Sequence, residues 1–283
     1  MPLSAVALAL GAAFLHAGWN VLLAGSRDTR AATAGLLIWG VALLAVPALL
    51  TRGVSSEAVP YIAASAVLEL GYFVLLARAY DGGEVSVVYP IARGSAPVVV
   101  LVVSAIALSE EVPAGAVVGI VLVAAGVLLV GLGVFPFRFA RKNASPGLEG
   151  GAGLRDVWFG LAIGAVIAGY TLVDSEGVER ADPIAYLALV VAPCALVYPF
   201  VAKVRPDVGV RTALTGAATF GAFLMVLAAF RLAPAAPVAA VRESSVVIAA
   251  LLAAVVLHEE VGARRLAGAV AVAAGVAAIA LSG

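Results

Sequence analysis

Apolar runs of about twenty residues recur along the whole chain and are separated by short polar links. An α-helix of this length crosses the hydrocarbon core of a bilayer and satisfies its own backbone polar groups. The period-two alternation of barrel strands is not seen. The pattern therefore predicts an all-α membrane protein with ten transmembrane helices, approximately at 3–24, 31–50, 58–80, 85–108, 114–135, 157–176, 183–202, 209–231, 235–257 and 263–282.

One longer link, residues 136–156, is rich in glycine and charge and divides the chain into two halves of five helices each. We predict a first five-helix repeat at 1–135 and a second at 157–283. Because five is odd, the second half must enter the membrane from the opposite side. This 5+5 inverted-topology repeat is common among secondary transporters.

The two halves also resemble each other in sequence. SEEVPAGAVVGIVLVAAGV, from Ser109, aligns with HEEVGARRLAGAVAVAAGV, from His258. The same offset places Arg93 on Arg242. Further coincidences pair Ser95 with Ser244, Gly119 with Gly268, Trp19 with Tyr170, Asn20 with Thr171 and Gly71 with Gly221.

Composition supports a membrane protein and narrows its partners. Of 283 residues, 64% are hydrophobic and 12% charged, whereas a soluble domain is about half apolar and a quarter charged. With 17 basic and 17 acidic residues, nothing indicates nucleic acid or a polybasic lipid anchor. The single cysteine, Cys194, excludes an internal disulfide and is interpreted as a core residue.

The links differ in charge between the two sides of the predicted bundle. Those on the side of the termini hold only Arg52, Arg180 and Arg231. The positive-inside rule therefore places the termini outside the cytoplasm. The basic residues on the other side are Arg27, Arg30, Arg78, Arg138, Arg141, Lys142, Arg155, Lys203, Arg205, Arg211, Arg264 and Arg265.

Four ionisable residues lie well inside predicted helices: Glu69, Arg93, Arg242 and Glu243. A charge at a helix centre costs about 2.5–3.5 kcal/mol on insertion scales, so such residues usually face a cavity or a partner. Arg93 and Arg242 are predicted to line a central cavity and bind an anionic group; the alternative is a pair of structural ion pairs. Glu69 is a candidate for proton coupling; the alternative is a permanent Glu69–Arg93 ion pair.

Neutral polar and aromatic residues extend this set. His16 and Asn20 share a helix face and could line the cavity, or Asn20 could bond another helix and Trp19 could anchor at the membrane interface. Tyr72, Tyr89 and Tyr170 are either pocket walls or core packing. The predicted substrate-binding or cavity-lining residues are His16, Trp19, Asn20, Glu69, Tyr72, Tyr89, Arg93, Ser95, Tyr170, Arg242, Glu243 and Ser244.

Two further features bear on the site. Pro90 and Pro97, with Gly94 between them, indicate a local backbone break in the fourth helix. Asp174, near the end of the sixth, is interpreted as interfacial.

Patterns for catalysis are missing from the sequence. We find no phosphate-binding Gly-Lys loop, no metal-ligand spacing, and two histidines too far apart along the chain to suggest a Ser/His/Asp arrangement. We therefore expect no enzyme activity, catalytic residue, metal or cofactor. The alternatives kept open are a polytopic membrane enzyme, which needs a reactive cluster near one interface, and a channel or sensor.

The segments HAGWNVLL, ARAYDGGEVSVVYPIARGSAPVVV, EEVPAGAVVGI and EEVGARRLAGA give the chain a family resemblance. It resembles EamA-type permeases of the drug/metabolite transporter superfamily, over essentially its whole length as two EamA repeats. The resemblance implies a central cavity formed largely by helices one, three, four, six, eight and nine. The second half departs from the pattern, with VAAVRES in place of YPIARG. Many relatives have cytoplasmic termini, so the orientation stays open.

The expected function is secondary transport of small organic metabolites, amino-acid-like or other, across the cytoplasmic membrane by alternating access. The resemblance implies efflux or exchange. The expected partners are a small-molecule substrate, the lipid bilayer and, as a candidate coupling ion, the proton. A monomer is compatible with the sequence, which leaves the oligomeric state open.

Overall fold

A computed structural model describes residues 1–51, 53–82, 85–107, 111–133, 154–257 and 262–282, which fold almost entirely into helices. Ten spans within these residues are long and apolar enough to cross a membrane. The helices are α1 (Leu3–Ala24), α2 (Thr29–Leu50), the short η1 (Ser56–Ala58), α3 (Val59–Gly82), α4 (Val85–Ala107), α5 (Ala114–Gly133), α6 (Leu154–Gly177), α7 (Pro183–Ala202), α8 (Val210–Phe230), α9 (Ala235–Arg242), α10 (Ser245–Leu257) and α11 (Ala263–Leu281). Most of the predicted 136–156 link lies outside the described residues.

Local capping fixes several helix ends. Asp28 caps α2 and accepts hydrogen bonds from the backbone N–H groups of Arg30 and Ala31 at 2.9 and 3.0 Å. Asp182 caps α7 in the same way, directly before Pro183 at the first helical position. These caps satisfy backbone donors that would otherwise be unpaired at a helix start. The sequence thus sets the short turns that reverse the chain at each membrane face.

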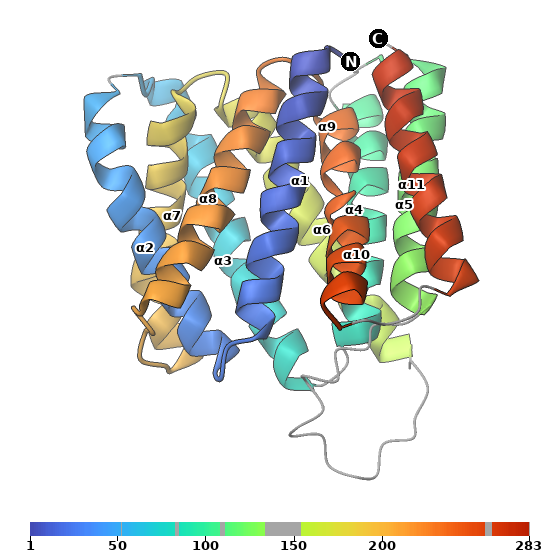
Figure 1. Cartoon of the computed structure of the whole chain (residues 1–283). Helices are drawn as coiled ribbons and strands as arrows, with labels where there is room; N and C mark the ends of the chain where they lie inside the picture. The colour runs from blue at the N-terminus through green and yellow to red at the C-terminus, as the bar shows by residue number, and fades with distance from the viewer. Residues whose placement is uncertain (52, 83–84, 108–110, 134–153, 258–261, 283) are drawn as a thin grey trace.

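The direction of the helices follows the predicted topology. Both termini lie on one face of the bundle, which we call the terminus face (Figure 1). The first helix, α1, starts at the terminus face, whereas α6 starts at the opposite face. Corresponding helices of the two halves therefore run in opposite directions, consistent with an inverted repeat.

The contacts between helices also follow the predicted repeat. The contact of α1 with α8 is matched by that of α6 with α3, and the contact of α4 with α6 by that of α1 with α9 and α10. The helices that the repeat relates to each other, α2 with α7 and α5 with α11, pack directly together. Such a set of neighbours is consistent with an approximate two-fold axis through the bundle.

Glycines bring α5 and α11 into close backbone contact. Gly119 faces Gly275, and Gly126 faces Gly268; a Cβ on either α5 glycine would lie 2.6 Å from the carbonyl oxygen of its partner. Small residues at helix interfaces let membrane helices approach closely, where packing drives association. The sequence alignment pairs Gly119 with Gly268, whereas in the structure Gly119 contacts Gly275. Each glycine therefore meets one that is not its repeat equivalent, as is expected when the two related helices are antiparallel.

We expect Gly126→Ala to destabilise the protein by about 1–3 kcal/mol, because its new methyl group meets backbone and the two helices must separate. Gly18→Ala is the matched control, since nothing lies within 4 Å of a Cβ at Gly18 and alanine favours the helix. Thermal unfolding in lipid nanodiscs compares the two variants. Equal unfolding temperatures for both would contradict the close α5–α11 packing.

The predicted backbone break lies in the ninth span rather than the fourth. The helix α4 continues through Pro90 and Pro97, and the ring of Pro90 packs where a Cβ on Gly131 would meet it at 2.2 Å. Membrane helices tolerate proline when neighbours support the backbone. The ninth span instead stops at Arg242 and resumes at Ser245.

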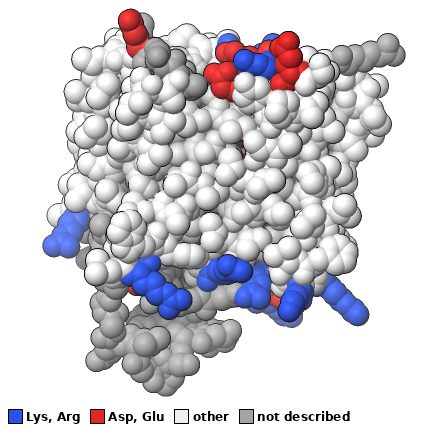
Figure 2. Space-filling model, turned by 180° about the vertical axis from the view of Figure 1, so that it is seen from behind, with Lys and Arg blue, Asp and Glu red and all other residues white. Residues whose placement is uncertain are grey.

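The surface of the molecule has two charged end faces with an apolar band between them. Figure 2 shows lysines and arginines gathered along the face opposite the termini, whereas acids and bases are mixed on the terminus face. The exposed basic residues of the opposite face include Arg27, Arg78 and Arg211. Between the two faces the visible surface is almost free of charge (Figure 2). Large apolar side chains well inside the helices, such as Val67 of α3 and Leu196 of α7, are exposed. This is the surface that a bilayer would cover.

Candidate functional site

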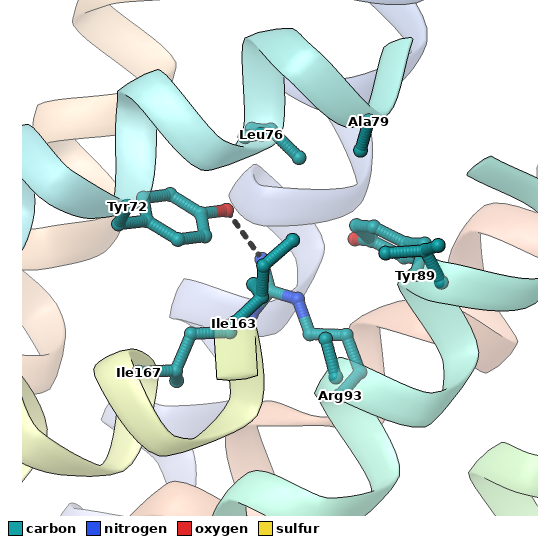
Figure 3. A pocket seen from close by; sticks show the side chains of 9 residues that line it. Tyr72, Leu76, Ala79, Tyr89, Arg93, Ile163 and Ile167 are labelled. Carbon is teal, nitrogen blue, oxygen red and sulfur yellow. Dashed lines mark hydrogen bonds between the residues drawn. The ribbon is translucent and has the colours of Figure 1, made fainter. Parts of the chain in front are cut away.

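Arg93 of α4 lies at the centre of a buried polar cluster and is 1% exposed. Its Nη1 donates to Glu243 Oε1 at 3.4 Å, and its Nη2 donates to the Tyr72 hydroxyl at 3.4 Å. The same nitrogen contacts His16 Nε2, and the guanidinium carbon lies 5.3 Å from the Tyr89 ring centroid. Tyr72 and Tyr89 flank the guanidinium group from two helices (Figure 3). Arg93 therefore joins α1, α3, α4 and α9 at one point.

Glu243 is shared by the two repeat-equivalent arginines. Its Oε1 lies 3.4 Å from Arg93 Nη1 and 3.4 Å from Arg242 Nη2. Its Oε2 has no hydrogen-bond partner among the described residues. We call Arg93, Arg242 and Glu243 the central triad; it holds two positive charges and one negative charge, all buried.

The interruption of the ninth span positions the two second-half members of the central triad. Arg242 closes the last turn of α9, and Glu243 stands immediately before the start of α10. A helix C-terminus favours a cation and a helix N-terminus favours an anion. The break between α9 and α10 therefore stabilises an arginine and a glutamate side by side within the membrane.

Glu69 of α3 is buried but does not pair with Arg93. It is 4% exposed, and no ion-pair partner for it occurs in the part of the chain that the structure describes. The charged groups close enough to influence it are Asp174, Arg242 and Arg93. The predicted alternative of a permanent Glu69–Arg93 ion pair is wrong, because Arg93 is turned to Glu243 of the other half.

The three α1 residues lie inside the bundle. Trp19 is 1% exposed, so its interpretation as an interfacial anchor is wrong. Its ring meets that of His16 edge-on, with centroids 4.9 Å apart. Asn20 donates to the backbone carbonyl of His16 at 2.8 Å and so bonds within its own helix. Of these three residues, His16 alone makes a polar contact with the central triad in the described part of the chain, through Arg93.

The remaining predicted residues divide into two kinds. Tyr170 is buried with its ring centroid 5.9 Å from that of Tyr72, and it extends the aromatic wall next to Arg93. Ser95 and Ser244 instead donate to backbone carbonyls three residues earlier, at 3.3 and 2.8 Å. The two serines occupy repeat-equivalent positions, and both hydroxyls bond to the backbone of the preceding turn.

A small cavity lies against Arg93 between α3, α4 and α6. Its volume of about 10 Å³ leaves room for one water molecule. Ala79, near the end of α3, and Val88, near the start of α4, place it between Arg93 and the face opposite the termini. Sequence reasoning missed its apolar lining, which is indistinguishable by type from ordinary packing residues; the full lining is Tyr72, Leu76, Ala79, Val88, Tyr89, Ala92, Arg93, Ile163 and Ile167 (Figure 3).

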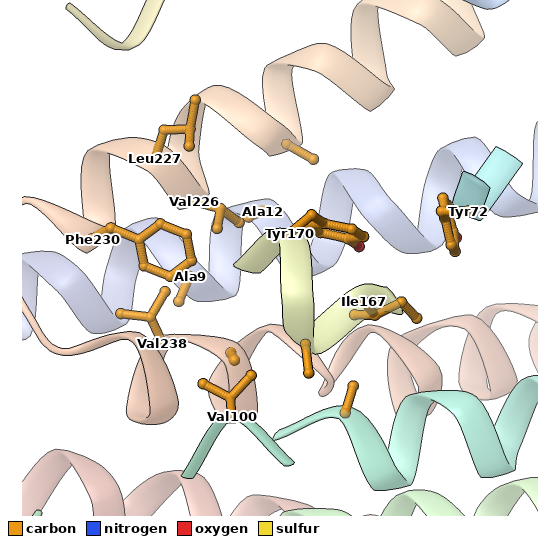
Figure 4. Close-up of a cluster of buried hydrophobic side chains, with 14 of the residues drawn as sticks. Ala9, Ala12, Tyr72, Val100, Ile167, Tyr170, Val226, Leu227, Phe230 and Val238 are labelled. Atoms are coloured by element: carbon orange, nitrogen blue, oxygen red, sulfur yellow. The ribbon is translucent and has the colours of Figure 1, made fainter. Parts of the chain in front are cut away.

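An apolar cluster closes the site toward the terminus face. Its members include Ala9 and Ala12 of α1, Phe230 at the end of α8 and Val238 of α9 (Figure 4). Side chains from α4, α6 and α8 complete it, namely Val100, Ile167, Val226 and Leu227. The central triad thus has a small cavity on one side and packed apolar side chains on the other.

Asp174 is a site residue that sequence reasoning placed wrongly. It is buried rather than interfacial, and its Oδ1 accepts hydrogen bonds from Ser65 Oγ at 2.5 Å and from the Tyr186 hydroxyl at 2.9 Å. Its position three residues before the end of α6 suggested a membrane face. Asp174 is buried because α3 and α7 pack beside it, and the local sequence of α6 does not show which helices will be its neighbours.

Comparisons with known proteins agree with this fold. Residues 155–281 match the sequence model of the EamA-like transporter family, whose members are transporters. No curated protein sequence matches the chain. The fold is similar to that of a protein of known crystal structure, with a TM-score of 0.75 and 15% sequence identity over 99% of this chain and 98% of that one. The chain is therefore a multi-pass membrane protein whose second half, residues 155–281, matches the EamA-like transporter family.

Proposed function

We propose that this protein is a secondary transporter of small organic solutes, amino-acid-like or other, in the cytoplasmic membrane. It would work by alternating access between two inverted five-helix repeats. The observation that carries the proposal is the buried contact of Arg93 in α4 with Glu243, which follows α9. One charge from each half meets its partner at the centre of the bundle, where secondary transporters of inverted-repeat architecture bind substrate.

The geometry of this contact suits a replaceable partner. Charge-assisted N–H···O⁻ hydrogen bonds are usually about 2.7–2.9 Å long. Both arginine contacts to Glu243 Oε1 are 3.4 Å long, so the carboxylate is shared rather than tightly bound. An anionic group of a substrate would compete with Glu243 for the two guanidinium groups.

The cavity volume supports a closed state of such a carrier. Room for one water cannot hold an organic solute, so substrate entry requires the halves to separate around the central triad. The face rich in arginine and lysine is cytoplasmic by the positive-inside rule, and the cavity lies toward that face. A substrate that loads from the cytoplasm would be exported or exchanged.

We further propose that Glu69 takes part in proton coupling. A buried carboxylate next to two arginines can respond to substrate binding by taking up or releasing a proton. We expect Glu69→Gln to lose the stimulation of transport by a pH gradient while exchange at equal pH on both sides persists. Radiolabelled uptake into proteoliposomes, with a substrate found by thermal-shift screening, measures both. Full stimulation in Glu69→Gln would remove Glu69 from the coupling step.

A further inference from the structure

A second buried polar cluster lies on the terminus side of the central triad. Ser65 near the start of α3, Asp174 near the end of α6 and Tyr186 in the first turns of α7 meet at one carboxylate oxygen. All three side chains are buried. We call this the Asp174 cluster. Because those helix ends lie at the terminus face, it stands between that face and the bundle centre (Figure 1).

Glu69 connects the Asp174 cluster to the central triad. Ser65 and Glu69 are four residues apart on α3 and so share a helix face. Glu69 is more than nine-tenths buried and has no hydrogen-bond partner among the described residues, although buried carboxylates are rarely left so. The titratable and charged groups near it are Asp174 and Tyr170 from α6, Arg93 from α4, Arg242 from α9, Tyr186 and Cys194 from α7, and Tyr72 on its own helix.

Gly177 makes room for the tyrosine of the Asp174 cluster. A Cβ on this residue would lie 2.5 Å from Tyr186 Cε2 and 2.7 Å from its hydroxyl oxygen. Any other residue would push the ring away from α6. The glycine at the end of α6 therefore lets the Tyr186 hydroxyl reach Asp174.

The other half of the chain has no such connection at the equivalent positions. The repeat alignment places Thr219 opposite Glu69, Thr215 opposite Ser65 and Leu23 opposite Asp174. Both threonine hydroxyls donate to backbone carbonyls of their own helix, at 2.7 and 2.8 Å, and Leu23 is buried. At these repeat-equivalent positions, the carboxylates therefore lie on the terminus side of the centre and have no counterparts in the other half.

We propose that Asp174, held by Ser65 and Tyr186, is a proton-binding site that exchanges protons between the terminus face and Glu69. A protonated Asp174 would give its proton to the Glu69 carboxylate, directly or through the Ser65 hydroxyl, and remain as a carboxylate. The Ser65 hydroxyl can both donate and accept. The site stands on its own geometry, while its use in transport rests on the proposed function.

Infrared difference spectroscopy of the full-length protein in lipid bilayers tests this without a substrate. Among the carboxylic C=O signals that titrate with pH in the wild-type protein, two should belong to Asp174 and Glu69. Asp174→Asn should remove one and Glu69→Gln the other. Glu176→Gln, on the same helix but about a third exposed, should leave both unchanged.

Two milder variants keep the test valid if Asp174→Asn does not fold. Ser65→Ala and Tyr186→Phe each remove one hydrogen bond to Asp174 and should shift the frequency of its C=O signal, with the Glu69 signal retained. In D₂O the Asp174 signal should exchange before the Glu69 signal. Failure of Asp174→Asn or of Glu69→Gln to remove a titrating signal, an Asp174 signal unmoved by both milder variants, or the reverse order of exchange would overturn the proposal. Each of these outcomes would overturn the Asp174 site without deciding whether the protein is a proton-coupled transporter. Conversely, a protein that fails to transport could still show both signals.

Discussion

Glu243→Gln is expected to destabilise the protein by about 3–5 kcal/mol, because it leaves two buried arginines without a counter-charge. Arg93 and Arg242 both depend on Glu243 Oε1, and both are buried. A neutral amide keeps the size of the side chain but removes its charge. Thermal or denaturant unfolding in nanodiscs, at equal lipid composition, measures the loss.

Glu176→Gln is the matched control for this prediction. Glu176 also pairs with an arginine, Arg180, at 3.2 Å, but both side chains are about a third exposed at the terminus face. Exposed i,i+4 pairs contribute about 0.3–0.5 kcal/mol. The double variant Arg93→Gln with Glu243→Gln should recover part of the lost stability, since it removes one of the stranded charges. Equal destabilisation by Glu243→Gln and Glu176→Gln would show that Glu243 does not neutralise the arginines.

Arg93→Gln is expected to lower transport by about a hundredfold or more, and Arg242→Gln by less than about tenfold. Removing one partner of a buried hydrogen-bonded charge pair costs about 2–5 kcal/mol in recognition, and about 1.4 kcal/mol corresponds to tenfold. Arg93 lines the cavity and contacts four side chains, from α1, α3, its own helix and the break between α9 and α10. Arg242 makes one polar side-chain contact within the described residues, to Glu243. Arg93 and Arg242 are equivalent by the repeat alignment, but they differ in the contacts that they make in the structure.

Arg93→Lys separates charge from geometry in the same uptake assay. Lysine keeps the positive charge but lacks the planar fork that reaches Glu243, His16 and Tyr72 together. We expect it to remain far below wild type. Near-complete recovery with lysine would mean that Arg93 supplies charge alone, and equal losses for Arg93→Gln and Arg242→Gln would contradict their unequal roles.

The helices could be predicted from sequence because apolar run length is a local property. The bounds of α1 and α7 match the prediction, and most others agree within a few residues. The break after Arg242 could not be predicted, because residues 238–257 include neither proline nor glycine. Pro90 and Pro97 pointed to α4 instead, but that helix is continuous, and Pro90 packs closely against Gly131.

The candidate site could be predicted in composition but not in pairing. The high insertion cost of a charge singles out Glu69, Arg93, Arg242 and Glu243. Which acid meets Arg93 depends on how the two halves dock, and a sequence of mostly alanine, valine and leucine does not specify that. Asp174 was misjudged for the same reason: depth can be read along a helix, whereas burial depends on neighbours distant in sequence.

Alternating access around Arg93 is tested most directly by counterflow in proteoliposomes. A metabolite that stabilises the purified protein in a thermal-shift screen is loaded unlabelled inside, and the labelled compound is added outside at low concentration. We predict a transient, saturable accumulation of label with wild type and none with Arg93→Gln in equally tight vesicles. Flux that does not saturate, or equal accumulation with Arg93→Gln, would contradict a carrier whose binding site is built on Arg93.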